Sequence, residues 1–119
     1  MRVLVTGSRE LDEPTTVFRV LHQYRDRNEL LIVRHGACPK GADLYAHQWC
    51  KMLDGKGVVE ESYPADWDNF GKAAGPIRNA QMINDGGIDL VLAFPRGIAK
   101  GTMNCVDLAQ RFGLKILFG

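Results

Sequence analysis

Several features that would place a protein in a large functional class are missing from this sequence. Its three cysteines, Cys38, Cys50 and Cys105, include no C-x-x-C pair, which argues against a disulfide framework and against a zinc site. The three histidines follow no metal-ligand spacing, so no metal is expected. The sequence contains neither the G-x-G-x-x-G fingerprint of ordinary dinucleotide-binding domains nor the G-x-x-x-x-G-K-[ST] loop of P-loop NTPases.

Excess charge and long apolar runs are missing as well. The 119 residues carry a formal net charge of +1, which is too small to attract nucleic acid or a membrane surface, so neither partner is expected. No segment approaches the roughly 20 apolar residues of a membrane span. A strand that begins next to Met1 leaves no room for a signal peptide, and we therefore expect a cytoplasmic protein.

Strand-like and helix-like patterns alternate along the whole chain. Short apolar runs predict strands at 2–6, 30–33, 58–61, 88–94 and 115–118. Helical spacing of apolar residues predicts helices at 14–27, 41–53, 75–83 and 101–112, with residues 62–73 as a loop. Leu44, Tyr45, Trp49, Met52 and Leu53 are expected on the buried face of the second helix. No linker or repeat divides the sequence, so residues 1–119 are expected to form one domain.

This alternation predicts the α/β class. Strands separated by helices pair in parallel through right-handed crossovers, which places helices on both faces of the sheet. The strands are almost continuously apolar, as is typical of a sheet that is covered on both sides. The expected architecture is therefore a Rossmann-like three-layer sandwich around a mainly parallel sheet of about five strands.

Three glycine-rich loops follow predicted strands, at 6–9, 35–43 and 94–102. In open parallel sheets the carboxyl ends of the strands share one edge, and ligands bind there. Each loop carries a cation, and two of the loops lead directly into a helix, whose N-terminal N–H groups and dipole attract anions. Together the loops predict a site for a small phosphate-bearing ligand.

The same residues also have simpler structural explanations. Glycine occurs in strand-to-helix loops for turn geometry alone. Thr102 is as well placed to cap a helix as to donate to a phosphate oxygen. Asp43 is either a first-turn acid or an acceptor for a ribose hydroxyl. Arg9 and Arg96 contact either solvent or ligand, while His35 is expected to be structural rather than a base.

The segment from Gly75 to Asn79 is a further point of interest. Glycine followed by proline is ordinary at a helix start, but Arg78 in the first turn opposes the helix dipole. That position is easier to understand if Arg78 meets an anion. Trp67 and Phe70 precede this helix and are expected to cover the core. Stacking of Trp67 on a base or another ring is the alternative.

The order and spacing of these pieces resemble the SLOG superfamily, named for its Smf/DprA and LOG branches, and within it the small YspA/YpsA-related branch of bacteria and phages. The matching pieces are Gly7-Ser8-Arg9, His35-Gly36, Gly41-Ala42-Asp43, Trp67, Ala74-Gly75-Pro76, Arg78-Asn79, Met82, Phe94-Pro95 and Gly101-Thr102. The resemblance covers nearly the whole chain. It implies a Rossmann-like homodimer that binds a nucleotide or a derivative such as ADP-ribose or another NAD-related molecule.

The resemblance also bears on catalysis. LOG members cleave the N-glycosidic bond of nucleoside 5′-monophosphates with an arginine, matched here by Arg78, and a glutamate whose position falls on Cys105. A thiol does not readily take over the work of that carboxylate. A sensor or binding domain that requires no cofactor is therefore the first expectation. An N-glycosidase that uses Asp43 or Asp66 as its carboxylate is the second, and a DprA-like accessory protein for single-stranded DNA is the third.

The roles expected at the site follow from these arguments. Arg9, Arg78 and the start of the last helix would hold phosphate, Asp43 would accept from a ribose hydroxyl, and Trp67 would flank the base. Arg78 and Asp43 would be the catalytic residues of the enzyme alternative. The expected ligand-binding residues are Gly7, Ser8, Arg9, His35, Gly36, Gly41, Asp43, Trp67, Arg78, Asn79, Pro95, Arg96, Gly97, Gly101 and Thr102.

Overall fold

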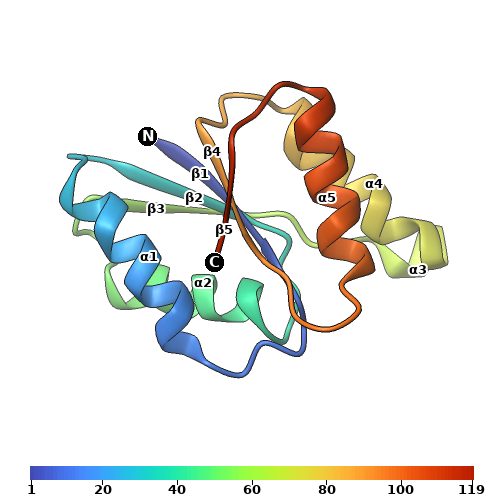
Figure 1. Ribbon diagram of the computed structural model, residues 1–119, viewed down its shortest axis with the longest axis horizontal. Coiled ribbons are helices and arrows are strands. Elements are labelled where there is room, and N and C mark those ends of the chain that lie inside the picture. The colour runs from blue at the N-terminus through green and yellow to red at the C-terminus, as the bar shows by residue number, and fades with distance from the viewer.

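The computed structural model describes residues 1–119, and at its centre lies a five-stranded sheet in the order β3-β2-β1-β4-β5 (Figure 1). Every neighbouring pair of strands is parallel. The strands are β1 (Arg2–Gly7), β2 (Leu31–His35), β3 (Val58–Ser62), β4 (Leu90–Phe94) and β5 (Ile116–Phe118). The predicted α/β class and the parallel five-stranded sheet are confirmed.

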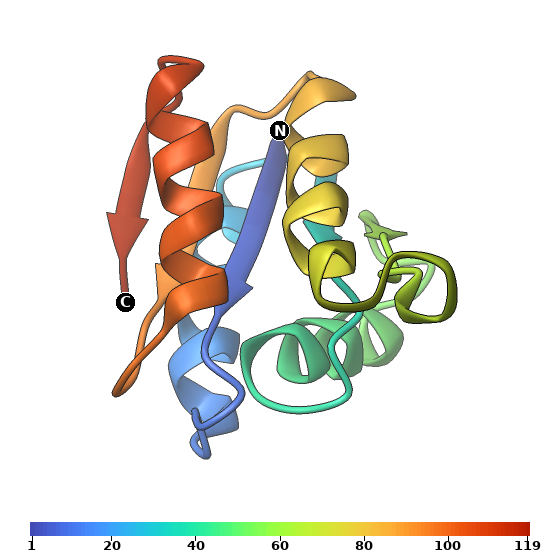
Figure 2. The same cartoon turned by 90° about the vertical axis from the view of Figure 1, so that its right-hand side faces the viewer.

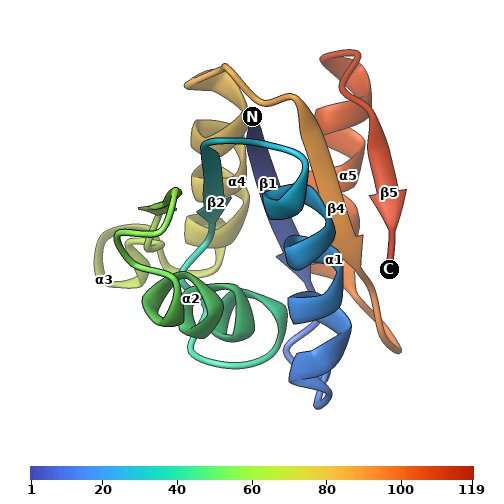
Figure 3. The same ribbon diagram turned by 90° about the vertical axis from the view of Figure 1, so that its left-hand side faces the viewer.

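Two helices cover each face of the sheet. Helices α1 (Pro14–Asp26) and α2 (Ala42–Met52) pack on one face, as Figure 3 shows, and α4 (Ala74–Asn84) and α5 (Lys100–Arg111) pack on the other, as Figure 2 shows. The chain passes from β1 outward to β3 and then returns to the far side of β1 at β4. The strand order therefore reverses between β1 and β4, which is where open α/β sheets form their crevice. None of the helices has the length and apolar character that crossing a bilayer requires.

Strand β1 is buried on both faces, and its side chains alternate between two cores. Val3 and Val5 point toward α1 and α2, where they join a cluster that includes Trp49. Leu4 points the other way and packs with Met82 of α4 and with residues of α5. This arrangement explains the continuous apolar sequence of β1, because successive side chains of a strand point to opposite faces.

The segment 62–73, predicted as a loop, contains the short helix α3 (Trp67–Phe70) and the 3₁₀ turn η1 (Gly71–Ala73). Asp66 caps α3, since its carboxylate accepts the Asn69 N–H at 3.2 Å. Four residues are too few to leave a helical period in a sequence. The prediction that Trp67 and Phe70 cover the core is wrong, because the two side chains are 48% and 50% exposed.

The predicted inner face of the second helix is also wrong at Met52, which is 56% exposed. Helix α2 rests on the sheet through small residues such as Ala46 together with the large Trp49, which turns Met52 toward solvent. Apolar side chains on several faces of a helix leave its buried face ambiguous until the contacts with the sheet select one.

Candidate functional site

A cavity of about 490 Å³ lies beyond the carboxyl end of β1, between the N-terminal turns of α4 and α5. It sits beside the point where the strand order reverses, as expected for this class of fold. Parallel register brings the strand ends together there, because Gly7 lies opposite Phe94 and Val5 lies opposite His35. The lining includes ten of the residues expected in the ligand site: Gly7, Ser8, Arg9, Gly36, Asp43, Trp67, Arg78, Asn79, Gly101 and Thr102.

The other five expected residues, His35, Gly41, Pro95, Arg96 and Gly97, do not line this cavity. Arg96 turns toward the end of the chain, where its Nη1 donates to the carbonyls of Pro95 at 2.7 Å and Gly119 at 3.1 Å. Gly41 instead allows the backbone to pack closely, because a side chain there would collide with the Ser8 carbonyl. Gly97 is exposed and adopts a φ of +58°.

The first turn of α5 offers unpaired N–H groups at the cavity. Its N-cap, Ala99, has no side-chain oxygen to cap the helix, and the N–H groups of the first turn have no acceptor within an α-helix. Thr102 lies inside the helix rather than at the N-cap, so it is a buried first-turn residue and not the cap. A Cβ added at Gly101 would meet no atom within 4 Å. The backbone there is open to the approach of an anion.

Arg78 extends from α4 into the cavity and holds two loops as it does so. Its Nη1 donates to the Gly36 carbonyl and, at 3.4 Å, to the Tyr63 carbonyl, while Nε donates to Asn79 Oδ1 at 3.0 Å. Gly36 is required for this approach, since any side chain would overlap the guanidinium. No carboxylate lies within ion-pair distance of Arg78. Its charge is therefore available to an anionic ligand.

Asp43 is the deepest carboxylate of the cavity, at 7% exposure in the first turn of α2. Its Oδ2 accepts the Cys38 N–H at 3.2 Å, which folds the loop after β2 back onto the helix. Burial raises the pKa of Asp43, while the hydrogen bond from the Cys38 N–H and the positive charge of Arg78 act in the opposite direction. The sequence-based alternatives of first-turn acid and ligand acceptor are thus compatible in one residue.

The outer rim carries an aromatic ring and further charges. The guanidinium carbon of Arg9 lies 5.9 Å from the centre of the Trp67 ring, a cation–π arrangement. Glu10 and Lys100 also reach the cavity, so its charged lining consists of three cations, Arg9, Arg78 and Lys100, against two carboxylates. Trp67 is half exposed and lines the cavity.

Asn79 joins the two helices that flank the cavity. Its Nδ2 donates to the Gly101 carbonyl at 3.2 Å and to Asn104 Oδ1 at 3.0 Å, while its own Oδ1 accepts from Arg78. With every polar atom engaged and 5% of its surface exposed, Asn79 fixes the spacing between α4 and α5. Its contribution to the site is to hold Arg78 and the start of α5 in place.

Cys105 is fully buried and lies outside the cavity lining. Burial raises the pKa of its thiol to about 11, although a hydrogen bond with Thr6 acts in the opposite direction. The thiol is therefore protonated at neutral pH and faces no ligand. Asp66 also lies outside the cavity, because its carboxylate caps α3. Asp43 and Glu10 are the carboxylates that line it.

The sequence analysis missed five polar residues of the lining: Thr6, Glu10, Cys38, Lys100 and Asn104. Lys100 had a usable signal, since it immediately precedes Gly101 at the predicted helix start. Asn104 follows Lys100 by four residues and therefore shares its helix face. Glu10 and Cys38 carry no comparable signal, because the folding of their loops decides where they point.

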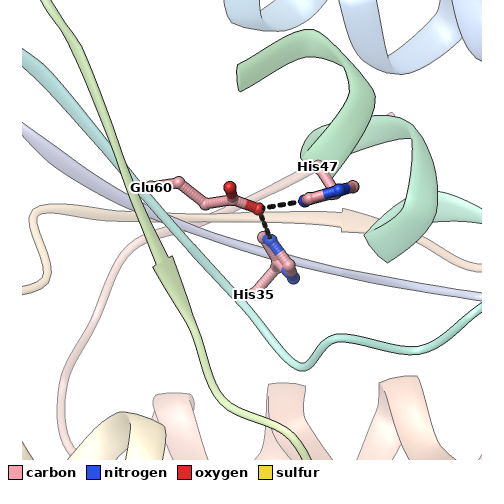
Figure 4. A group of neighbouring side chains, drawn as sticks. All are labelled: His35, His47 and Glu60. Atoms are coloured by element: carbon pink, nitrogen blue, oxygen red, sulfur yellow. Dashed lines mark hydrogen bonds and ion pairs between the residues drawn. The ribbon is translucent and has the colours of Figure 1, made fainter. Parts of the chain in front are cut away.

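A second cluster lies beneath the loop after β2, where three side chains of metal-binding type converge (Figure 4). His35 Nε2 and His47 Nδ1 both lie 2.6 Å from Glu60 Oε2. Burial acts to raise the pKa of Glu60, but the hydrogen bonds from the two histidines outweigh it and lower that pKa. Sequence spacing gave no sign of this group, since its members come from β2, α2 and β3. An adjoining cavity of about 210 Å³ is lined by both histidines and shares Cys38 and Asp43 with the larger one.

The fit of a metal to this cluster depends on the tautomer of His35. The Ala37 N–H donates to His35 Nδ1 at 3.0 Å, so in the neutral ring the proton resides on Nε2. A metal at Nε2 needs the opposite tautomer, in which the other ring nitrogen donates its proton to an acceptor. The Ala37 N–H is a donor, and the hydrogen bonds therefore favour a carboxylate held by two histidines over a metal centre.

The model of the YspA, cpYpsA-related SLOG family matches residues 1–70, which is more than half of the chain. The chain belongs to this family. The gene 61 protein of Mycobacterium phage D29 is 40% identical to this SLOG protein over 119 residues, which cover 98% of this chain and 94% of the phage protein. Membership in the family indicates a nucleotide-related role, either binding or a glycosidase-like reaction.

Proposed function

We propose that this SLOG protein binds a nucleotide or a nucleotide-derived molecule of the ADP-ribose or NAD type, and acts as a sensor or binding domain. One observation carries the proposal: the uncapped first turn of α5 and the guanidinium of Arg78, which has no carboxylate partner, line the same cavity. Both groups attract a phosphate. A volume of about 490 Å³ also falls within the range of about 300–1,000 Å³ typical of small-molecule sites.

The lining suggests how such a ligand would be oriented. Phosphate would lie against the N–H groups at Gly101 and accept from Arg78, whose Nη2 has no hydrogen-bond partner within the chain. A ribose hydroxyl would donate to Asp43, and the base would stack on Trp67 beside Arg9. Each part of the ligand would thus meet a group of complementary chemistry.

Cleavage of an N-glycosidic bond is the competing activity, and Asp43 is the residue that supports it. A buried carboxylate with a raised pKa is a common feature of general acids. Binding is favoured over cleavage because the position of the LOG glutamate holds Cys105, which is buried away from the cavity. Glycosidases ordinarily use two carboxylates, and the second carboxylate of this cavity, Glu10, comes from the loop after β1 and not from the position of the LOG glutamate.

Ligand identity can be tested by mass spectrometry of small molecules released from protein purified out of cells, followed by calorimetric titration with AMP, ADP-ribose and NAD. We expect a nucleotide among the released molecules and saturable binding of at least one probe. Arg78→Ala should weaken that binding by about tenfold or more, the effect of one charge-assisted contact. Arg96→Ala is the matched control, because this strand-end arginine lies outside the cavity and its loss should leave the affinity unchanged.

Two outcomes would contradict the proposal. Absence of binding by all three probes, together with no nucleotide among the released molecules, would remove the ligand class. An equal loss of affinity in Arg78→Ala and Arg96→Ala would place the ligand elsewhere. Release of ribose 5-phosphate from AMP, abolished by Asp43→Asn, would instead establish the glycosidase.

A further inference from the structure

The loop between β2 and α2 contains the chain's one non-glycine residue with a left-handed backbone, Ala37, at a φ of +56°. L-residues other than glycine, asparagine and aspartate rarely adopt this region, because Cβ crowds the following carbonyl oxygen. A hydrogen bond stabilises this conformation, because the Ala37 N–H donates to His35 Nδ1. It is followed directly by the Cys38 N–H that binds Asp43. The residue with the strained backbone, Ala37, is therefore directly followed by the residue whose N–H binds the cavity carboxylate, Asp43 in α2.

The ring that accepts from Ala37 is itself held in place. His35 is 1% exposed, and its Nε2 faces Glu60 Oε2 at 2.6 Å, as the dashed line in Figure 4 shows. Glu60 also contacts His47 at 2.6 Å and lies 3.7 Å from the Lys51 ammonium. A carboxylate accepts and does not donate, so it favours the His35 tautomer that carries its proton on Nε2. Only that neutral form leaves a lone pair on Nδ1 for Ala37.

We propose that His35 is a positioning residue of the ligand site: anchored by Glu60, it holds Ala37 in its left-handed conformation so that the following loop orients Asp43 toward the cavity. This role rests on the proposed function for its effect on a ligand, but its structural part stands independently. His35 itself lines the smaller cavity and not the larger one, so its influence on a nucleotide passes through the loop. The two ring nitrogens make different contacts, Nδ1 with the Ala37 N–H and Nε2 with Glu60, and a substitution can remove each contact separately.

The first experiment needs no ligand. Long-range ¹H–¹⁵N NMR spectra of the wild-type protein at neutral pH distinguish the two neutral tautomers of each histidine. We expect His35 to carry its proton on Nε2, and the Ala37 amide to be protected from hydrogen exchange although it lies in a loop. A proton on Nδ1, or an Ala37 amide that exchanges as fast as an exposed loop amide, would overturn the proposal.

Zn²⁺ added alone in the same experiment tests the competing interpretation. We expect the His35 resonances to remain unchanged, because the Ala37 N–H occupies the nitrogen that a metal-binding ring would need as a donor. A stoichiometric change of His35 to the Nδ1–H tautomer would show that the cluster is a metal site and would overturn the proposal.

The second experiment uses two variants of His35, each of which keeps one of the two hydrogen-bonding functions of the ring. His35→Asn retains an acceptor near the position of Nδ1, and His35→Gln retains a donor near the position of Nε2. With AMP as the probe, we expect His35→Asn to bind within about threefold of wild type and His35→Gln to bind about tenfold more weakly. Urea denaturation of both variants checks that neither has lost its fold.

The outcomes of the two experiments separate the inference from the proposed function. If wild-type protein binds none of AMP, ADP-ribose and NAD and releases no nucleotide, but His35 shows the Nε2–H tautomer and the Ala37 amide is protected, the ligand assignment fails and the loop-holding role remains. If AMP binds but His35→Asn and His35→Gln lose affinity equally, the contact with Ala37 does not position the site. His47→Ala, which removes a half-exposed neighbour in contact with Glu60, should leave the tautomer of His35 unchanged.

Discussion

Two arginines lie at opposite ends of helix α4, and their surroundings differ. Arg34 of β2 reaches the C-terminal end, where its guanidinium donates to the carbonyls of Met82 at 2.6 Å and Gly86 at 3.1 Å and pairs with Glu61 at 3.0 Å. Its guanidinium carbon also lies 5.2 Å from the centre of the Tyr63 ring. At 3% exposure, this arginine is buried and its charge is fully compensated.

Arg78, at the N-terminal end of the same helix, is compensated only in part. It donates to two backbone carbonyls and to Asn79, and it borders a cavity, but it forms no ion pair with a carboxylate. Buried charges in folded proteins are ordinarily paired, because an unpaired one carries a large desolvation cost. The difference between the two arginines is the basis for proposing that Arg78, which is only partly buried, binds an anionic ligand, whereas Arg34 stabilises the fold.

The largest effect is expected from removal of the compensated arginine. Arg34→Met leaves Glu61 with one cationic partner and two helix-end carbonyls without a donor, so the free energy of unfolding should fall by about 3 kcal/mol. Urea denaturation followed by circular dichroism measures this change. Arg19→Met, on the exposed side of α1, is the control and should change stability by less than about 0.5 kcal/mol. Equal unfolding midpoints for the two variants would show that the pairing does not stabilise the fold.

For Arg78, we expect a larger effect on ligand affinity than on stability. Arg78→Lys keeps the positive charge but loses the planar guanidinium, whose several N–H groups can donate to the loop carbonyls and to a phosphate at the same time. AMP affinity should therefore fall by about tenfold. Its stability loss should be smaller than that of Arg34→Met, because no buried carboxylate loses its partner. Calorimetry and urea denaturation of the same samples give both quantities. A variant that is strongly destabilised and binds normally would make Arg78 a second structural arginine.

The compensated arginine also implies a dependence of stability on pH. Burial acts to raise the pKa of Glu61, but hydrogen bonds from Arg2 and Arg34 outweigh it and the pKa lies below 4.5. The native value is therefore lower than the unfolded one, and the stabilisation is present above about pH 4.5 and lost as pH falls through the native pKa. The unfolding midpoint of the wild type should fall between about pH 5 and 3, and that of Glu61→Gln should fall less steeply. Parallel slopes would contradict this assignment.

Asp43 should respond with the opposite sign. Its native pKa is raised by burial, so the ionised carboxylate destabilises the fold, and this cost appears as pH rises through the native pKa. Asp43→Asn keeps an oxygen for the Cys38 N–H and should raise the thermal midpoint at pH 7, with a smaller gain at pH 3. AMP should bind the variant more weakly if the carboxylate accepts from a ribose hydroxyl. Unchanged affinity would remove Asp43 from the ligand site.

The smallest effect is expected at Gly101. The space beside its Cα is open, so Gly101→Ala should fold normally and gain at most about 1 kcal/mol from helix propensity. AMP affinity should nevertheless fall by about threefold, because the added methyl occupies the approach to the helix N-terminus. Met103→Ala, on the same helix but outside the cavity, is the control and should bind normally. Normal binding by Gly101→Ala would move the phosphate away from this turn.

The amino-acid sequence by itself determined the fold class and the edge of the sheet where a site would lie. Alternating apolar patterns are local signals, and parallel pairing then brings the strand-end loops of β1, β2 and β4 to one edge whatever their exact residues. Only the tertiary structure decided that Lys100 lines the cavity while Arg96 turns away, and that Gly36 makes room for Arg78. It also decided that His35, His47 and Glu60 converge, because such contacts depend on the register and packing of separate elements, which no local pattern records.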